Sequence, residues 1–195
     1  MDIRVDFLES GYFYHIYNRG INSCVIFKDD NDKYFFLKRL KEYLLDYVDF
    51  YAYCLMSNHY HLILRIKNNI TLTPLKPKMG LHSQQSIVSK QIGKLMSSYT
   101  QAFNKKYHRH GALLEKPFKR KRIISEEYLR QAIVYVHRNS LDINNKMEDY
   151  LFSSYPTILS TAITDIKRRE VIALFEDVEN FVFCHQKESL YRWNY

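Results

Sequence analysis

The sequence predicts an α+β fold of the ferredoxin-like type, with an antiparallel sheet, helices packed on one face and a C-terminal helical extension. Strand-like and helix-like hydrophobic patterns follow one another in the order β-α-β-β-α-β, and a further helical pattern comes after them. The 195 residues are 46% hydrophobic and 26% charged, with only 5 Gly and 4 Pro. This composition is typical of a folded chain and excludes disordered, collagen-like and low-complexity classes.

The first half of the pattern supplies a strand, a helix and a hairpin. Residues 12–17 are dense in aromatic and β-branched side chains and end at an Asn-Arg-Gly turn signal. The acidic run 29–32 provides N-cap chemistry for a helix whose apolar residues recur every three or four positions over 36–48. Two strand-like runs, 50–56 and 59–66, flank Ser57-Asn58 and predict the hairpin.

The second half contains a long helix, a strand and another helix. Residues 67–83 carry Pro and Gly without a period, which predicts a flexible connection. An amphipathic pattern over 84–107 predicts the long helix, 122–125 could form a fourth strand, and a helix follows over 126–139. We therefore expect one domain over residues 1–140 and an acidic extension over 141–195, with the second face of the sheet available for ligands.

The positive charge of the chain is concentrated in one stretch. The formal net charge is +8, yet residues 141–195 contain nine acidic and six basic residues. Residues 105–122 hold one acid, Glu115, and eight bases: Lys105, Lys106, Arg109, Lys116, Lys119, Arg120, Lys121 and Arg122. Bases interleaved with aromatic rings are typical of nucleic-acid-binding surfaces, because cations neutralise phosphates and rings stack on bases. The alternative is a solvated loop beside a basic helix end.

Two histidines lie two positions apart in a predicted strand. Because side chains alternate across a strand, His59 and His61 point to one face and Tyr60 to the other. Two imidazoles on one face can bind a single metal ion. A pair of polar residues on an exposed sheet face would have the same spacing.

A tyrosine on the long helix is a candidate nucleophile. Tyr99 belongs to the apolar stripe Val88, Ile92, Leu95, Tyr99 and Phe103, which we expect to face the sheet and so to bring Tyr99 toward the histidines. A tyrosine can attack a phosphodiester and hold the broken strand as a phosphotyrosine ester. Core packing is the alternative, because the chain has 17 tyrosines.

Four ordered blocks resemble the REP-associated tyrosine transposases and their single-tyrosine insertion-sequence relatives. The blocks are Tyr14-His-Ile-Tyr-Asn-Arg-Gly20, Tyr53-Cys-Leu-Met-Ser-Asn-His-Tyr-His-Leu62, Ser98-Tyr-Thr-Gln-Ala-Phe-Asn104 and Tyr135-Val-His-Arg-Asn139. The resemblance implies that His59 and His61 bind magnesium or manganese and that Tyr99 is the catalytic nucleophile. It also implies a substrate of single-stranded DNA beside a hairpin, which is cut and rejoined through a 5′-phosphotyrosine intermediate.

The resemblance is incomplete at one position. Relatives often have a third metal ligand four residues after the nucleophile, where this chain has Phe103. Asn104 and Gln101 are nearby substitutes, and the third ligand stays open. We expect the eight bases of 105–122 to bind phosphates, with Arg19 in the Asn-Arg-Gly turn as a further DNA contact.

Two other functional classes remain open on the sequence. A non-catalytic module could bind structured nucleic acid through the same basic stretch, and a domesticated protein could nick DNA without moving its own gene. We expect a bacterial, cytoplasmic and nucleoid-associated protein without membrane contact, because neither a signal peptide nor a long apolar run is present in the sequence. Monomer and homodimer are both compatible with it.

Overall fold

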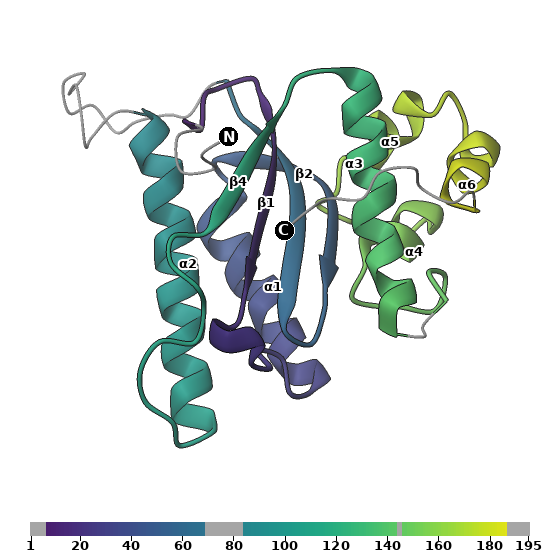
Figure 1. Ribbon diagram of the computed structural model, residues 1–195. Coiled ribbons are helices and arrows are strands. Elements are labelled where there is room, and N and C mark those ends of the chain that lie inside the picture. Colours follow the sequence, from purple (N-terminus) through teal and green to yellow (C-terminus); the bar gives the residue numbers. More distant parts are fainter. Residues whose placement is uncertain (1–6, 69–83, 144–145, 187–195) are drawn as a thin grey trace.

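The computed structural model of the chain describes residues 7–68, 84–143 and 146–186 (Figure 1). Most of the predicted connection 67–83 lies outside these residues. In chain order the elements are β1 (Phe13–Arg19), η1 (Ile21–Ser23), α1 (Asp30–Leu44), β2 (Val48–Leu55), β3 (His59–Ile66), α2 (Gln84–Lys106), β4 (Lys119–Ile123), α3 (Glu126–Arg138), η2 (Asn139–Ile143), α4 (Ser154–Leu159), α5 (Arg168–Leu174) and α6 (Val178–Gln186).

The four strands form one antiparallel sheet in the order β2-β3-β1-β4. Helices α1 and α2 cover one face, as Figure 1 shows. This arrangement confirms the predicted fold class. The additional helix α3 lies on the opposite face, with the C-terminal helices beyond it, so the face that the sequence predicts to be open is partly covered.

Helix α1 begins where the sequence predicts. The side chain of Asp29 accepts a hydrogen bond from the backbone N–H of Asp32, which satisfies one of the donors that a helix start leaves unpaired. Phe36, Leu40 and Leu44 are buried on the side of α1 that faces the sheet. The helix ends at Leu44, earlier than the predicted residue 48, because the chain turns there into β2.

Strand β4 differs from the prediction in its position. It spans Lys119–Ile123 rather than 122–125, so Lys119, Arg120 and Lys121 join Arg122 in an edge strand instead of lying in the loop before it. Side chains alternate across a strand, and the four bases therefore divide between two faces. Lys121 lies over the ring of Tyr128 on α3, whereas Arg120 donates to Ser89 Oγ on α2 at 2.9 Å.

The acidic extension is packed onto the domain that precedes it. Backbone hydrogen bonds join Leu55 of β2 to Phe152 and Phe50 of β2 to Lys167. Arg138 at the end of α3 donates to the carbonyl of His185 in α6 at 2.7 Å. Within the described residues, no helix combines the length and the apolarity that crossing a membrane requires.

Candidate active site

The histidine pair lies at the start of β3, one of the two central strands of the sheet, on the face that α3 covers. In the β1–β3 register His59 is opposite Arg19 and His61 is opposite Tyr17, and Tyr17 is in turn opposite Lys119 of β4. Paired residues in neighbouring strands share a face, so these five side chains form two adjacent rows. Two imidazoles, a phenol and two cations are thereby brought to one region of the sheet.

A pocket of about 250 Å³ opens at this end of the sheet. Among the described residues, its lining combines imidazoles, carboxamides, hydroxyls and cations, with no carboxylate. The lining residues are Tyr17, Asn18, Arg19, Ser23, Asn58, His59, His61, Lys119 and Asn139. Such a lining suits an anionic ligand, because cations and amide N–H groups are donors.

Hydrogen bonds orient both imidazoles. His59 Nδ1 lies 2.6 Å from Asn58 Oδ1, and a carboxamide oxygen only accepts, so Nδ1 carries the proton and Nε2 keeps its lone pair. His61 Nδ1 lies 2.8 Å from His15 Nε2, and one of these two nitrogens donates to the other. When His61 Nδ1 is the donor, its Nε2 is also left as a metal-binding atom.

Burial keeps the imidazoles of His61 and His15 neutral. Desolvation lowers the pKa of His61 well below its ordinary value, and the positive charges that His15 and His59 can carry lower it further. Burial, with a smaller contribution from Lys121, lowers the pKa of His15 to about 3. Only the unprotonated imidazole coordinates a metal, so His61 is ready to bind one at neutral pH without losing a proton.

The donor set fits a weakly held divalent cation. No group of three or more His, Cys, Asp or Glu with metal-binding geometry occurs in the described ranges, so His59 and His61 need a donor of another kind. Asn139 is buried and lines the same pocket. Its Nδ2 donates to the carbonyl of Tyr135 at 2.7 Å, which leaves Oδ1 for a cation. Imidazole nitrogen combined with amide oxygen and water is compatible with manganese or magnesium.

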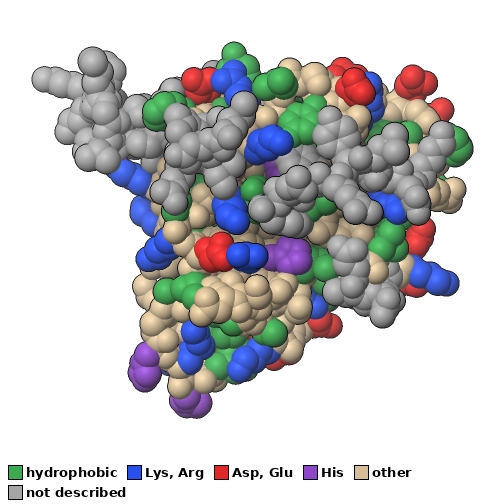
Figure 2. Space-filling view, viewed as in Figure 1, with side chains coloured by type: hydrophobic (Ala, Val, Ile, Leu, Met, Phe, Trp, Pro, Cys, Tyr) green, Lys and Arg blue, Asp and Glu red, His purple; other side chains and the backbone are tan. Residues whose placement is uncertain are grey.

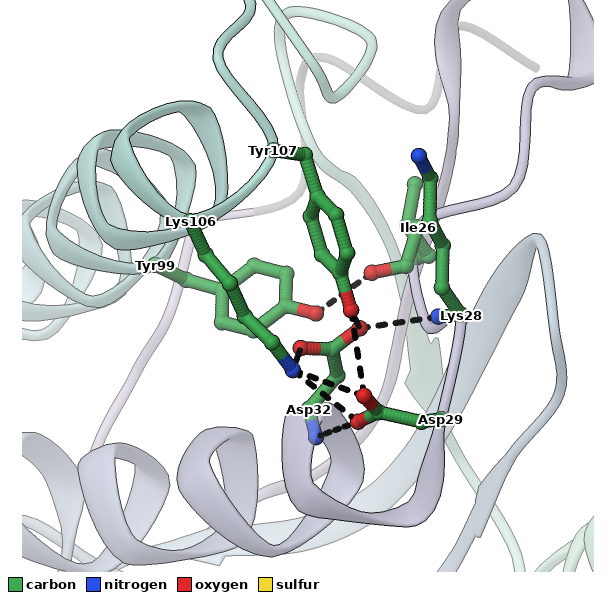
Figure 3. Close-up of polar contacts among 7 residues, drawn as sticks. All are labelled: Ile26, Lys28, Asp29, Asp32, Tyr99, Lys106 and Tyr107. Carbon is green, nitrogen blue, oxygen red and sulfur yellow. Dashed lines mark hydrogen bonds and ion pairs between the residues drawn. The ribbon is translucent and has the colours of Figure 1, made fainter.

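Tyr99 does not lie at this pocket, so the expected approach of Tyr99 to the histidines is wrong. Its phenol is buried and donates a short hydrogen bond to the carbonyl of Ile26, as Figure 3 shows. Its ring packs edge-on against the ring of Phe36 on α1, with centroids 5.1 Å apart. The ring of Phe36 in turn packs against that of Tyr60, with centroids 4.8 Å apart. Tyr60 alternates with the histidines along β3, so Tyr99 and the histidines lie on opposite faces of the sheet.

The surroundings of Tyr99 also oppose its ionisation. Burial raises the pKa of its phenol far above the ordinary value, and the negative charge of Asp32 raises it further. A phenol that is held in the core and resists deprotonation is a poor nucleophile. The alternative of core packing describes Tyr99 correctly.

Tyr135 faces the histidines from α3, the helix that covers their side of the sheet. Its half-buried ring meets His61 edge-on, with ring centroids 5.6 Å apart, and lies 6.2 Å from the ring of His15. It belongs to the block Tyr135-Val-His-Arg-Asn139, which the sequence analysis noted without assigning a role to its tyrosine. Asn139 follows four residues later, on the same side of the helix. The four-residue spacing of Tyr135 and Asn139 is the sequence feature that could have indicated this pair.

Not all of the predicted DNA-binding residues lie at the pocket. Arg19 and Lys119 line it and share Glu115, with Arg19 Nε 2.5 Å and Lys119 Nζ 3.7 Å from its carboxylate oxygens. Arg109 donates to Asn104 Oδ1 at 2.8 Å and to the carbonyl of Ala112 at 3.1 Å, which holds the loop that follows α2.

Lys106 is engaged in an ion network away from the pocket (Figure 3). Its ammonium lies 2.8 Å from Asp29 Oδ2 and 2.7 Å from Asp32 Oδ1, and Tyr107 donates to Asp32 Oδ2 at 2.8 Å. The hydrogen bonds to Asp29 and then Asp32 raise the pKa of Lys106. This network joins the start of α1 to the end of α2, so we assign Lys106 to the fold.

The remaining cations give one side of the molecule a basic character. Figure 2 shows Lys and Arg side chains down the side that α2 forms in Figure 1, and Asp and Glu mostly toward the top and right. Lys105 and Lys116 are exposed. Arg122 donates to Glu9 at 2.8 Å, and its guanidinium stacks over the ring of Tyr12 at 3.4 Å.

Comparison with known proteins gives one match of fold. No family model matches the chain, and no curated protein matches it. A solved structure described as a REP-associated tyrosine transposase bound to a REP hairpin matches with a TM-score of 0.56 and 11% identity. The match covers 84% of this chain and 93% of that one. At this identity the likeness shows the fold, and it is to the same group of proteins that the four sequence blocks resemble.

Proposed function

We propose that this protein cuts and rejoins single-stranded DNA beside a hairpin, with Tyr135 as the nucleophile and His59 and His61 as ligands of magnesium or manganese. The observation that carries the proposal is the edge-on contact between Tyr135 and His61 beside a cationic pocket. The fold of a transposase bound to a hairpin supports the choice of DNA as substrate. On this proposal the protein acts in the bacterial cytoplasm, at the nucleoid.

The chain's own groups would carry out the transfer. The Tyr135 oxygen attacks the scissile phosphorus, the bond from phosphorus to the 3′ oxygen breaks, and the phenolic proton ends on the departing 3′ hydroxyl. The 5′ end is then held as a phosphotyrosine ester, which a second 3′ hydroxyl can reverse without a nucleotide cofactor. Arg19 and Lys119 would bind the phosphate oxygens, and Asn139 and the two imidazoles would hold the cation, which would supply charge neutralisation at those oxygens.

Glu115 would tune the cations of the pocket. Its carboxylate contacts both Arg19 and Lys119, so the two cations are held in place before a phosphate arrives. A phosphate would compete with Glu115 for the same donors. The carboxylate of Glu115 therefore positions the two cations that would bind the phosphate.

Removal of either histidine should abolish cleavage. His59→Ala and His61→Ala each leave a single imidazole, which holds a labile cation poorly, so we expect strand cleavage to fall by at least about 100-fold. The measurement is cleavage of a labelled hairpin with a single-stranded extension, with magnesium or manganese and with excess chelator. His110→Ala, in the exposed loop after α2, is the matched control. Cleavage that persists in chelator, or in both variants, would contradict the metal assignment.

The two faces of β4 should differ in DNA binding. Lys119 and Lys121 share the face of the histidines, so we expect their double replacement by Ala to flatten the dependence of log affinity on log salt by up to about 1.4, or 0.7 for each lost single-strand contact. The charge-matched control replaces Arg120 and Arg122, which point to the other face. Both are measured by salt titration of binding. A slope left unchanged by the Lys119 and Lys121 double variant would mean that the histidine face is not the DNA face.

A further inference from the structure

A second, larger pocket lies between α2 and the segment that leads into β4. It has a volume of about 520 Å³, within the range of ligand-binding pockets. Its floor is mostly apolar, with hydroxyl and carboxamide groups on the helix side and one cation. The lining residues are Gly93, Met96, Ser97, Thr100, Gln101, Ala112, Leu113, Leu114, Lys116, Pro117 and Phe118.

Gly93 makes the helical wall of this pocket open. It lies in the interior of α2, where glycine is less favourable than alanine. A Cβ built at this position meets nothing within 4 Å, so the fold itself does not require glycine here. Met96, Ser97, Thr100 and Gln101 follow at helical spacing and line the same pocket. The absence of a side chain at Gly93 leaves the space that a ligand would fill.

The two pockets lie on opposite faces of the sheet and approach each other at Asn18. Asn18 lines the pocket of the histidines, and its Nδ2 lies 3.7 Å from the sulfur of Met96, which lines the second pocket. The same Nδ2 donates to the carbonyl of Glu115 at 3.0 Å. Lys116 then borders the second pocket and Lys119 the first. A strand that occupies both pockets therefore has to pass around the edge of the sheet.

The groups in the second pocket match those of a nucleotide. The ring of Phe118 lies on one wall, with the guanidinium of Arg120 stacked over it at 5.2 Å, so it can also stack on a planar base. Gln101 donates to Ser97 Oγ at 3.2 Å, which leaves its carboxamide oxygen as an acceptor for the edge of a base. Lys116 is exposed at the rim and makes no ion pair with a described residue.

We infer that this pocket holds one unstacked nucleobase of the same single-stranded DNA whose phosphate lies at the histidines. The inference rests on the proposed function for its substrate. None of the described residues that line the pocket is a carboxylate, which agrees with an anionic strand as the occupant. Lys116 would contact the phosphate of the same nucleotide.

Filling the pocket tests the inference. A Cβ at Gly93 meets nothing within 4 Å, so Gly93→Leu directs a larger side chain from there into the pocket, and Gly93→Ala is the control that leaves most of the volume. With the full chain and a hairpin that carries a single-stranded extension, we expect Gly93→Leu to weaken binding about tenfold, as loss of one stacked base does. Gly93→Ala should bind normally and melt at a higher temperature. Phe118→Leu should weaken binding as well, by removal of the stacking ring.

Abasic substitution then identifies the base. In the wild-type protein one abasic position of the extension should weaken binding about tenfold, and in Gly93→Leu the same position should cause no further loss. An all-RNA version of the oligonucleotide distinguishes DNA from RNA, since both carry bases. Additive losses, or normal binding by a folded Gly93→Leu, would overturn the inference. Binding needs no cleavage, so this outcome is separate from failure of Tyr135 as the nucleophile.

Discussion

Replacing Tyr135 by Phe is expected to reduce strand cleavage by at least about 1,000-fold while the affinity for hairpin DNA changes little. Only the phenolic oxygen is removed, and in the proposed reaction this oxygen forms the bond to phosphorus. The edge-on packing of the ring against His61 does not need the hydroxyl. The measurement is the yield of a denaturant-resistant protein–DNA adduct on a labelled hairpin with a single-stranded extension.

Two other tyrosines provide controls with the same chemical change. Tyr17 stacks at 4.8 Å on His15 and lines the pocket, and burial raises the pKa of its phenol. Tyr99 lies in the core on the other face. Tyr17→Phe and Tyr99→Phe should both retain adduct formation, although Tyr99→Phe should unfold more easily because the Ile26 carbonyl loses its buried donor. Loss of the adduct in Tyr17→Phe alone would transfer the nucleophilic role to Tyr17.

The second large effect is expected at His137, in a buried network that fixes α3 to the extension. His137 Nδ1 lies 2.8 Å from His185 Nε2, and His137 Nε2 lies 2.7 Å from Ser154 Oγ. His185 Nδ1 in turn donates to the carbonyl of Phe181 at 2.7 Å. We expect His137→Ala to lower the free energy of unfolding by about 3 kcal/mol or more, because a cavity forms and buried polar atoms lose their partners. Urea unfolding measures this change.

The network also makes a prediction about coupling. His185→Ala should destabilise the protein by a similar amount, and the double variant should cost less than the sum, since both changes break the same hydrogen bond. His110→Ala in the exposed loop should leave the unfolding midpoint unchanged. Additive effects of His137→Ala and His185→Ala would show that the extension is not held by this network.

The order of strands and helices could be predicted because it depends on local periodicity. Period-two alternation over 59–66 placed His59 and His61 on one face, and the Asp29 cap located the start of α1. Both are properties of a few consecutive residues. The site could not be predicted in this way, because it joins residues of β1, β3 and α3, which are far apart in the chain.

The error over Tyr99 has a physical origin. An amphipathic stripe indicates that a helix packs on the sheet, yet it does not indicate on which face. Tyr60 points away from His59 and His61, and α1 and α2 cover the face of Tyr60, so the stripe of α2 buries Tyr99 there. The stripe itself was predicted correctly.

The secondary structure of the basic run 119–122 also depends on its tertiary contacts. Residues 119–122 are consecutive charges without an apolar alternation, which is why the strand was expected to start only at Arg122. It forms a strand because β1 offers an unpaired edge, and an edge strand tolerates charge on both faces. The division of its side chains between the faces followed from the pairing, which periodicity alone does not supply.

The most direct test of the site is to identify the residue that carries the DNA. The wild-type protein is incubated with a hairpin that carries a single-stranded extension and manganese, the adduct is digested with protease and nuclease, and the modified peptide is sequenced by mass spectrometry. The account predicts a nucleotide esterified through its 5′ phosphate to Tyr135, within the α3 peptide. A nucleotide on Tyr99, Tyr17 or any other residue would contradict it.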